Sequence, residues 1–439
     1  MGRNELENLV RMALEVASER GVDQAEAVTS VDTGLAATAR LGDVENLEYT
    51  NDRGLWITVF KDSRKGNAST SDVSPEAIRE AVDKACTFAE CTAQDEYAGL
   101  ADAELMCTEV PDLELDHPWS IEASDAIDMA IACEKAGLEF DTRINNSEGA
   151  TVSSNRGIRA YGNTHGFVGS YTKTNHSISC VVLASENGDM QRDYYYSSAR
   201  DSADLEDIQA IGEIAGRRAV GRLGARKIPT TKAPVLFIPE LARGFIGHAI
   251  GAIAGGAQYR RASFLLDAVG EQVFPDFVRI EERPHIPKGL ASRAYDGEGV
   301  ATYDRDIVTD GVLREYILSS YSARRLGLKT TANAGGAQNL FVPGSGGDLQ
   351  SLLQEMGTGF VVEELIGHGT NMVTGDYSRG AVGQWVENGE IQYPVHEVTI
   401  AGNLRDLYPR IAAIGDDQDL RGGIRCGSLL VDEMTIAGA

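Results

Sequence analysis

The chain has 439 residues, of which 40 are Lys or Arg and 66 are Asp or Glu, so its formal net charge is −26. This length allows two or three domains with large cores, and a hydrophobic content of 42% is typical of a soluble protein. The negative charge repels nucleic-acid phosphates and anionic lipids, and we therefore expect neither nucleic acid nor a membrane as a partner. The longest apolar run, near residues 233–257, contains Glu240, Arg243 and His248 and does not have the pattern of a membrane span.

The six cysteines show no CxxC spacing, and the N-terminal residues have the pattern of an amphipathic helix without an apolar leader. We therefore expect a cytoplasmic protein with free thiols. The cysteines are Cys86, Cys91, Cys107, Cys133, Cys180 and Cys426.

The sequence predicts an α+β module over residues 1–100. Apolar residues recur at helical spacing over 5–20, which predicts a helix that ends at Gly21. Short alternating runs then predict an antiparallel meander, and Ser74 followed by Pro75 predicts the start of a helix that continues to about Cys91. The expected strands are 25–31, 35–41, 44–49 and 54–61.

A second α+β module is expected over residues 101–228. Residues 95–118 are acidic and irregular, which is typical of a linker or a long surface loop. A helical pattern follows at 122–139, and then strands within 150–200, including 157–161, 165–173 and 177–185. A helix over about 204–223 ends the module, so its architecture is related to that of the first.

From residue 229 to 439 the sequence predicts a mostly antiparallel β domain that wraps a buried helix. Asp310-Gly311 and Asn388-Gly389 are hairpin turn signals between apolar runs. Helical patterns occur only at 240–256, 316–326 and 348–356. The fold class is therefore α+β, with two N-terminal modules before this domain.

The predicted helix over 240–256 is apolar around most of its circumference, which indicates burial. Four glycines nevertheless lie on one stripe, and each costs roughly 0.5–1 kcal/mol of helix stability relative to alanine. We expect backbone or a ligand to press against that stripe, which consists of Gly244, Gly247, Gly251 and Gly255. His248 lies at its edge, and it is either a buried histidine bonded to a carbonyl or a polar group that faces a cleft.

Two other segments are candidates for chemistry. Cys426 follows Arg425, a cation that would lower the pKa of the thiol, although a small hydrophobic role in a strand also fits. Residues 374–380 hold Asp376, Tyr377 and Arg379, which indicates either a tight turn with an internal Asp–Arg pair or a binding loop. The seven histidines include no HxH or HxxxH pair, whereas a catalytic zinc commonly takes two ligands from one helix.

Long strings in the chain resemble the TldD/PmbA family of metallopeptidases, and within it the TldE (PmbA) branch. The resemblance covers nearly the whole chain and is densest from residue 233 to 439. The strings are Phe245-Ile-Gly-His-Ala-Ile-Gly-Ala-Ile, Tyr259-Arg-Arg-Ala-Ser-Phe-Leu-Leu-Asp, Gly289-Leu-Ala-Ser, Tyr321-Ser-Ala-Arg-Arg-Leu-Gly-Leu, Glu355-Met-Gly-Thr-Gly, Gly375-Asp-Tyr-Ser-Arg-Gly-Ala, Trp385-Val-Glu-Asn-Gly-Glu-Ile-Gln-Tyr-Pro-Val and Ile400-Ala-Gly-Asn-Leu.

The resemblance implies a metal site that has lost its ligands. The TldD branch carries His-Glu-x-x-x-His on the buried helix and a cysteine near the C-terminus. Those positions fall here on Gly247, His248, Ala252 and Cys426. We therefore expect no metal in this chain and zinc in a TldD-type partner chain.

Three functions remain open at this point. In the first, the chain is the non-catalytic subunit of a two-chain metallopeptidase for peptides or unfolded proteins, and it shapes the chamber with His248, Asp376, Tyr377 and Arg379 as substrate contacts. In the second, it is a free-standing metallopeptidase with ligands from His248, Cys426 and either His368 or His396. In the third, it is a non-enzymatic binding or regulatory protein, and the isolated chain forms a homodimer.

Overall fold

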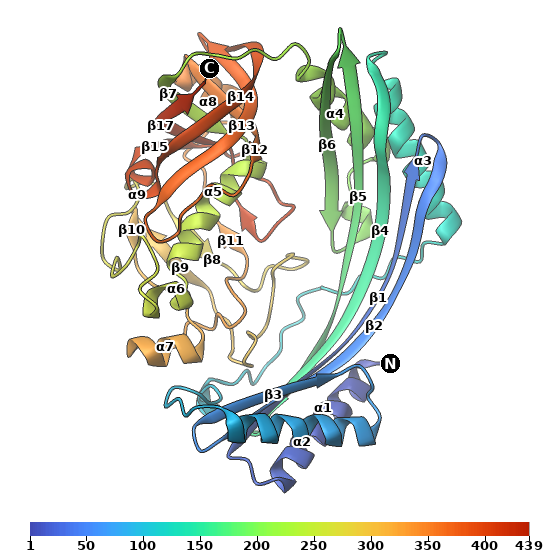
Figure 1. Cartoon of the computed structure of the whole chain (residues 1–439), viewed down its shortest axis with the longest axis vertical. Helices are drawn as coiled ribbons and strands as arrows, with labels where there is room; N and C mark the ends of the chain where they lie inside the picture. The colour runs from blue at the N-terminus through green and yellow to red at the C-terminus, as the bar shows by residue number, and fades with distance from the viewer. Residues whose placement is uncertain (439) are drawn as a thin grey trace.

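The computed structural model describes residues 1–438, and it consists of a long curved sheet and a separate barrel domain (Figure 1). The sheet has six antiparallel strands in the order β3-β2-β1-β4-β5-β6. Its strands are β1 (Gln24–Arg40), β2 (Asp43–Lys61), β3 (Arg64–Thr70), β4 (Ile144–Asn163), β5 (Val168–Glu186) and β6 (Asp189–Ala199). The fold class predicted from the sequence, α+β with a β-rich C-terminal domain, is confirmed. The two N-terminal modules share this one sheet, because β1 of the first pairs with β4 of the second.

Four helices cover one face of the sheet. They are α1 (Arg3–Glu19), α2 (Pro75–Cys91), α3 (Ala123–Glu139) and α4 (Ile208–Gly221). Ala25 and Ala27 of β1 pack in the core under α1 and α2, and Ala37 and Ala39 pack in the core under α3 and α4. Because side chains alternate along a strand, the even-numbered residues of β1 lie on the opposite face. That face is concave and turns toward the barrel domain (Figure 1).

The four short strands predicted between residues 25 and 61 are in fact two long ones, β1 and β2. The gaps predicted between strands, at residues 32–34 and 50–53, lie opposite each other in the sheet, since Asp32 pairs with Asp52 and Gly34 with Thr50. The prediction failed there because residues 43–53 of β2 are almost all exposed, so polar side chains interrupt the apolar alternation. The backbone ladder continues without interruption across this polar segment.

Five strands of the C-terminal domain close into a barrel. The order is β14-β13-β12-β7-β17, with β15 beyond β17, and β14 also pairs with β17 through Ile400 and Ile436. Only the pair β7–β12 is parallel within it. The strands are β7 (Thr231–Phe237), β12 (Gly359–Ile366), β13 (Asp376–Glu387), β14 (Glu390–Asn403), β15 (Ile411–Ile414) and β17 (Leu429–Ala437).

Both predicted hairpin turns of this domain are confirmed. Asp310-Gly311 joins β9 (Arg305–Thr309) to β10 (Val312–Leu313), and Asn388-Gly389 joins β13 to β14. All four residues have the positive φ that such turns require. A smaller sheet carries β8 (Ile280–Glu282), β9 (Arg305–Thr309), β10 (Val312–Leu313), β11 (Leu340–Phe341) and β16 (Ile424–Arg425). The remaining helices are α5 (Pro239–Ala252), α6 (Gly255–Tyr259), α7 (Ser320–Leu326), α8 (Leu349–Met356) and α9 (Leu404–Leu407).

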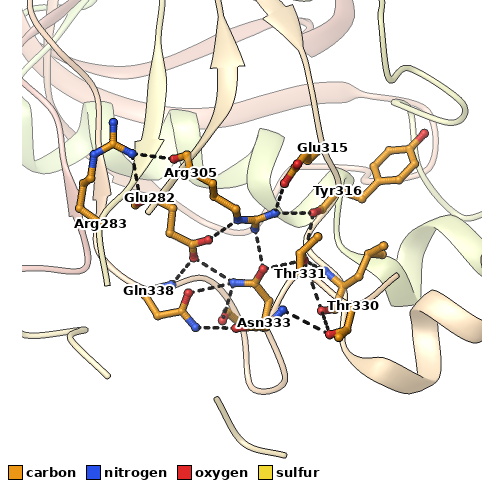
Figure 2. A network of polar contacts seen from close by, with 12 residues as sticks. Glu282, Arg283, Arg305, Glu315, Tyr316, Thr330, Thr331, Asn333 and Gln338 are labelled. Atoms are coloured by element: carbon orange, nitrogen blue, oxygen red, sulfur yellow. Dashed lines mark hydrogen bonds and ion pairs between the residues drawn. The ribbon is translucent and has the colours of Figure 1, made fainter. Parts of the chain in front are cut away.

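A buried polar network fixes the irregular segment 330–339 onto the smaller sheet (Figure 2). Arg305 Nε lies 2.7 Å from Glu282 Oε2, and both side chains are at most 5% exposed. Asn333 donates to Glu282 Oε1 at 2.9 Å and accepts from Arg305 Nη2 at 2.5 Å. The backbone N–H of Gln338 also donates to Glu282, so this one carboxylate joins two segments.

The predicted helix over 240–256 is shorter in the structure, because α5 ends at Ala252. Ala254 is extended, and the N–H of Gly255 donates instead to the carbonyl of Ile317 at 2.8 Å. Side chains on one side of α5 lie in the barrel core, among them Phe245, which stacks on Phe237 at 5.0 Å. None of the helices within residues 1–438 is long and apolar enough to cross a membrane.

Candidate functional site

The glycine face of α5 is open. A Cβ added at Gly244 would meet nothing within 4 Å, and one added at Gly247 or Gly251 would meet only a side-chain carbon, at 3.6 and 3.3 Å. The expectation of protein backbone against this stripe is therefore wrong for these three residues. At Gly255, which belongs to α6, the close neighbours of an added Cβ are side-chain atoms of Ser322 and Leu318. The barrel covers the opposite side of α5, which leaves the glycines exposed or half-buried.

His248 lies beside this open face. Its ring is half-buried and meets the ring of Tyr377 edge to face, with 5.9 Å between centroids. Burial, and then the positive charge of Arg379, lower the pKa of His248 below its usual value. The ring is therefore neutral at pH 7, and the hydrogen bonds described for residues 1–438 include none to it. It remains available to a group that enters from the open side.

Tyr377 and Arg379 come from β13, where side chains alternate between the two faces. Tyr377 is buried, and burial raises the pKa of its hydroxyl to about 12. Asp376 lies on the other face, where it accepts from Thr374 Oγ1 at 2.6 Å and Asn403 Nδ2 at 3.1 Å. Arg379 donates to the carbonyl of Leu365, so the alternative of a tight turn with an internal Asp–Arg pair is wrong. The structure brings His248, Tyr377 and Arg379 together and leaves Asp376 outside that group.

Cys426 follows β16 and is fully buried in the same core as α5. Burial and the charge of Asp417 raise the pKa of its thiol to about 12. The sequence-based alternative in which Arg425 lowers this pKa is therefore wrong, because the loss of hydration outweighs any effect of the neighbouring cation. Ile424, two residues earlier, reaches Gly247, which places this strand against the open face of α5.

The donor groups do not match a zinc site. The three helix positions hold Gly247, His248 and Ala252, of which only His248 has a donor side chain. His368 is exposed in the segment after β12, and His396 lies on β14. Across residues 1–438, no three His, Cys, Asp or Glu side chains are grouped so that they could hold a metal ion.

An ionic cluster that the sequence analysis missed joins the N-terminal end of α5 to the second module. Glu240 accepts from Arg218 of α4 at 2.7 Å and from Arg421 at 2.6 Å. Arg243 pairs with Asp419 at 3.0 Å and donates to the hydroxyl of Tyr196 on β6 at 2.8 Å. These residues come from distant parts of the chain, so no local pattern indicated their contact.

A curved sheet that faces a barrel domain is the fold of a known class of metallopeptidase. Three family models match in chain order: PmbA/TldA metallopeptidase domain 1 over residues 25–89, the central domain over 116–223 and the C-terminal domain over 230–438. The chain belongs to the PmbA/TldD metallopeptidase family.

Two curated relatives illustrate the range of similarity. Metalloprotease PmbA of Escherichia coli O157:H7 is 50% identical over 436 residues, which cover 99% of this chain and 97% of that protein. A metalloprotease TldD homolog of Haemophilus influenzae is 24% identical and covers 60% of this chain and 61% of its own length.

Two solved structures have the same fold. A proposed modulator of DNA gyrase from Bacteroides thetaiotaomicron has a TM-score of 0.95 and 27% identity, with full coverage of both chains. TldE of Thermococcus kodakarensis has a TM-score of 0.85 and 19% identity, and the match covers 98% of this chain and 99% of that one. At 19% identity the second likeness concerns the fold alone.

Proposed function

We propose that this chain is the non-catalytic, TldE-type subunit of a two-chain metallopeptidase, and that a TldD-type partner chain holds the zinc. The observation that supports this is the donor set on α5. A glycine, a histidine and an alanine occupy the positions that carry His-Glu-x-x-x-His in the TldD branch, and Cys426 has a raised pKa in the core. Zinc requires deprotonated donors in tetrahedral geometry, and these residues do not provide them.

The subunit would shape the chamber in which the partner cleaves peptides. The open face of α5 has no side chains larger than hydrogen at Gly244, Gly247 and Gly251, so an extended peptide can approach the helix backbone. His248 and Arg379 border that face and would supply polar contacts, while Tyr377 supports the histidine ring. Asp376 is directed elsewhere and is not part of this contact surface.

The test is metal content by elemental analysis, on this chain alone and after mixing with a TldD-type chain from the same cell. The proposal expects no stoichiometric metal in the isolated chain and about one metal per pair in an active complex. Near-stoichiometric zinc in the isolated chain, lost in Cys426→Ala with the fold retained by circular dichroism, would overturn it. A pair that lacks peptidase activity would overturn it as well.

A further inference from the structure

Four basic side chains gather where the concave face of the sheet meets the barrel domain. Arg159 of β4 and Lys173 of β5 lie on the concave face. Their sequence neighbours Ile158 and Thr174 are buried on the opposite face, and side chains alternate between the two faces along a strand. Arg200 follows β6, and Arg293 belongs to a loop of the C-terminal domain. We call these four residues the basic cluster. In a chain of net charge −26, such a grouping is unexpected.

The strand register places two members of the cluster, Arg159 and Lys173, near each other on the neighbouring strands β4 and β5. Arg159 is paired with Tyr171, and Gly157 lies between Asp32 and Lys173 on the neighbouring strands. A Cβ at Gly157 would lie 2.5 Å from Asp32 Oδ1 and 3.8 Å from Lys173 Cε, so both side chains extend over the glycine. Asp32 is therefore a carboxylate close to Lys173, one negative charge beside the positive charges of the cluster.

Arg200 ties the two domains together at this point. The residue is only 6% exposed, and its Nη1 donates to the carbonyl of Thr174 at 2.7 Å. Its Nη2 donates to the carbonyl of Leu290 at 2.5 Å, three residues before Arg293. Neither partner is a carboxylate, and Nε has no partner among the described residues. A buried guanidinium without a counter-ion is costly unless an anion approaches it.

A cavity adjoins the basic cluster at Arg293. Of the four cluster residues, Arg293 lines this cavity, which has a volume of about 1090 Å³ and is also lined by Tyr171, Tyr295 and Arg3. The Tyr295 hydroxyl is buried and has no hydrogen-bond partner in residues 1–438. The acidic residues of the cavity lie mainly on its linker wall, where Asp116 is already paired with Arg156 at 2.7 Å.

Electrostatics agree with this geometry. Partial desolvation, and then the charges of Arg200, Arg293 and Arg159, lower the pKa of Lys173, while Asp32 opposes them. Desolvation also lowers the pKa of Arg200, and Arg293 adds to that effect. An anion bound among these groups would relieve their mutual repulsion and raise the pKa of Lys173.

We propose that the basic cluster binds a carboxylate of the peptide substrate, with Lys173 and Arg293 as the contacting groups and Arg200 as the residue that positions them. Arg presents a fork of N–H donors that matches a carboxylate, and Lys adds a point charge. The inference rests on the proposed function, since it assigns a substrate class to the concave face of this subunit. The carboxylate is either the free C-terminus of the peptide or an acidic side chain.

The test uses fluorescence anisotropy of the isolated full chain with three labelled hexapeptides. The first peptide has neutral side chains and a free C-terminus. The second has the same sequence but is C-terminally amidated, and the third is amidated and carries one internal Glu in place of a neutral residue. Binding of the first peptide at least tenfold more tightly than the second assigns the C-terminal carboxylate, and equally tight binding of the third assigns an acidic side chain as well. The variants Lys173→Gln and Arg293→Gln are expected to remove this preference. Lys84→Gln, an exposed cation on the outer helix α2, is the matched control and is expected to retain it.

A second measurement covers the case of weak peptide binding. In protein with ¹³C-methylated lysines, N-acetyl-alanine is expected to raise the pKa of Lys173 and N-acetyl-alanine amide to leave it unchanged. Equal effects of the two compounds, together with equal affinity for the three peptides, would overturn the carboxylate site. That result leaves the pairing with a TldD-type chain intact, because metal content and peptidase activity of the mixed complex test the pairing separately.

Discussion

The ring of His248 meets the ring of Tyr377 at an interplanar angle of 68°, with the centroids 5.9 Å apart. This edge-to-face contact joins α5 to β13 and fixes the orientation of the only donor side chain at the three helix positions. Arg379, two residues beyond Tyr377, adds its charge on the same side. The protonation of His248 therefore depends on a residue from another element.

Replacement of Arg379 by glutamine is expected to raise the pKa of His248 toward its ordinary value of 6.5. The substitution removes the cation that disfavours the imidazolium, although burial, the larger cause, remains. The pKa is measured by NMR titration of the histidine ring. Arg410→Gln, at an exposed pair with Glu433, is the control and is expected to leave the pKa unchanged. An unaltered pKa of His248 in the Arg379→Gln variant would show that the charge of Arg379 does not lower it.

The same shift predicts a pH dependence of stability. Because the pKa of His248 is lower in the folded chain than in the unfolded chain, the unfolded chain binds the proton first as the pH falls. The free energy of unfolding should therefore decrease as the pH drops below about 6.5, the unfolded value. His248→Gln should make that slope shallower between pH 7 and pH 5 in denaturant titrations. Identical slopes in the two proteins would show that His248 makes no contribution.

Alanine at Gly244 is expected to stabilise the chain by about 0.5–1 kcal/mol, because the site is in the middle of α5 and an added methyl group meets nothing. The matched variant is Gly255→Ala, which is expected to destabilise the chain because its methyl group would collide with Ser322. Chemical denaturation of both variants checks the prediction. If Gly244→Ala lowers stability, the glycine face is covered by something other than solvent.

Removal of the Glu282 carboxylate is expected to lower the free energy of unfolding by up to about 3–5 kcal/mol, because the buried Arg305 would lose its buried partner and keep only the half-exposed Glu315. The measurement is the free energy of unfolding of Glu282→Ala. The control is Glu271→Ala, at a pair with Arg405 in which both side chains are about half exposed, and a change of about 0–1 kcal/mol is expected there. Comparable losses in the two variants would contradict the importance of the network in Figure 2.

Native Cys426 is expected to resist iodoacetamide at pH 8. Its thiol is fully buried, and its pKa of about 12 leaves almost no thiolate. Cys91, which is exposed, is the internal reference and should be alkylated under the same conditions. Peptide mass spectrometry with and without denaturant measures both residues, and rapid native labelling of Cys426 would show that its burial is incomplete.

Local signals in the sequence were sufficient to predict much of the fold. The Ser74-Pro75 helix start and the two positive-φ hairpin turns are confirmed, because each depends on residues that are adjacent in the chain. The continuity of β1 and β2 was missed, since an exposed sheet segment imposes no apolar alternation. The pairing of β1 with β4, which merges the two modules, depends on residues more than a hundred positions apart.

The candidate site was predictable only in part. The glycine stripe and His248 were visible as a pattern on one helix, but which side of that helix is open depends on how the barrel packs against it. The proximity of Arg379 to His248 and the concentration of charge around Lys173 depend on strand register, so neither could be seen in the sequence. It stays a prediction that a lost metal site is represented by Gly247, His248, Ala252 and Cys426. The metal content of the isolated chain tests it.

The barrel begins and ends at neighbouring positions. Thr231 of β7 pairs with Ile436 of β17, and Thr230 exchanges hydrogen bonds with Gly438. A unit whose two ends meet can be cut out, circularly permuted or inserted into another protein with little disturbance. Force or motion then passes between the barrel and the curved sheet through the chain segment before β7 and through noncovalent contacts, among them those of Arg200 and Arg421. Exchanging barrels between family members would then be a practical way to build chimeric subunits.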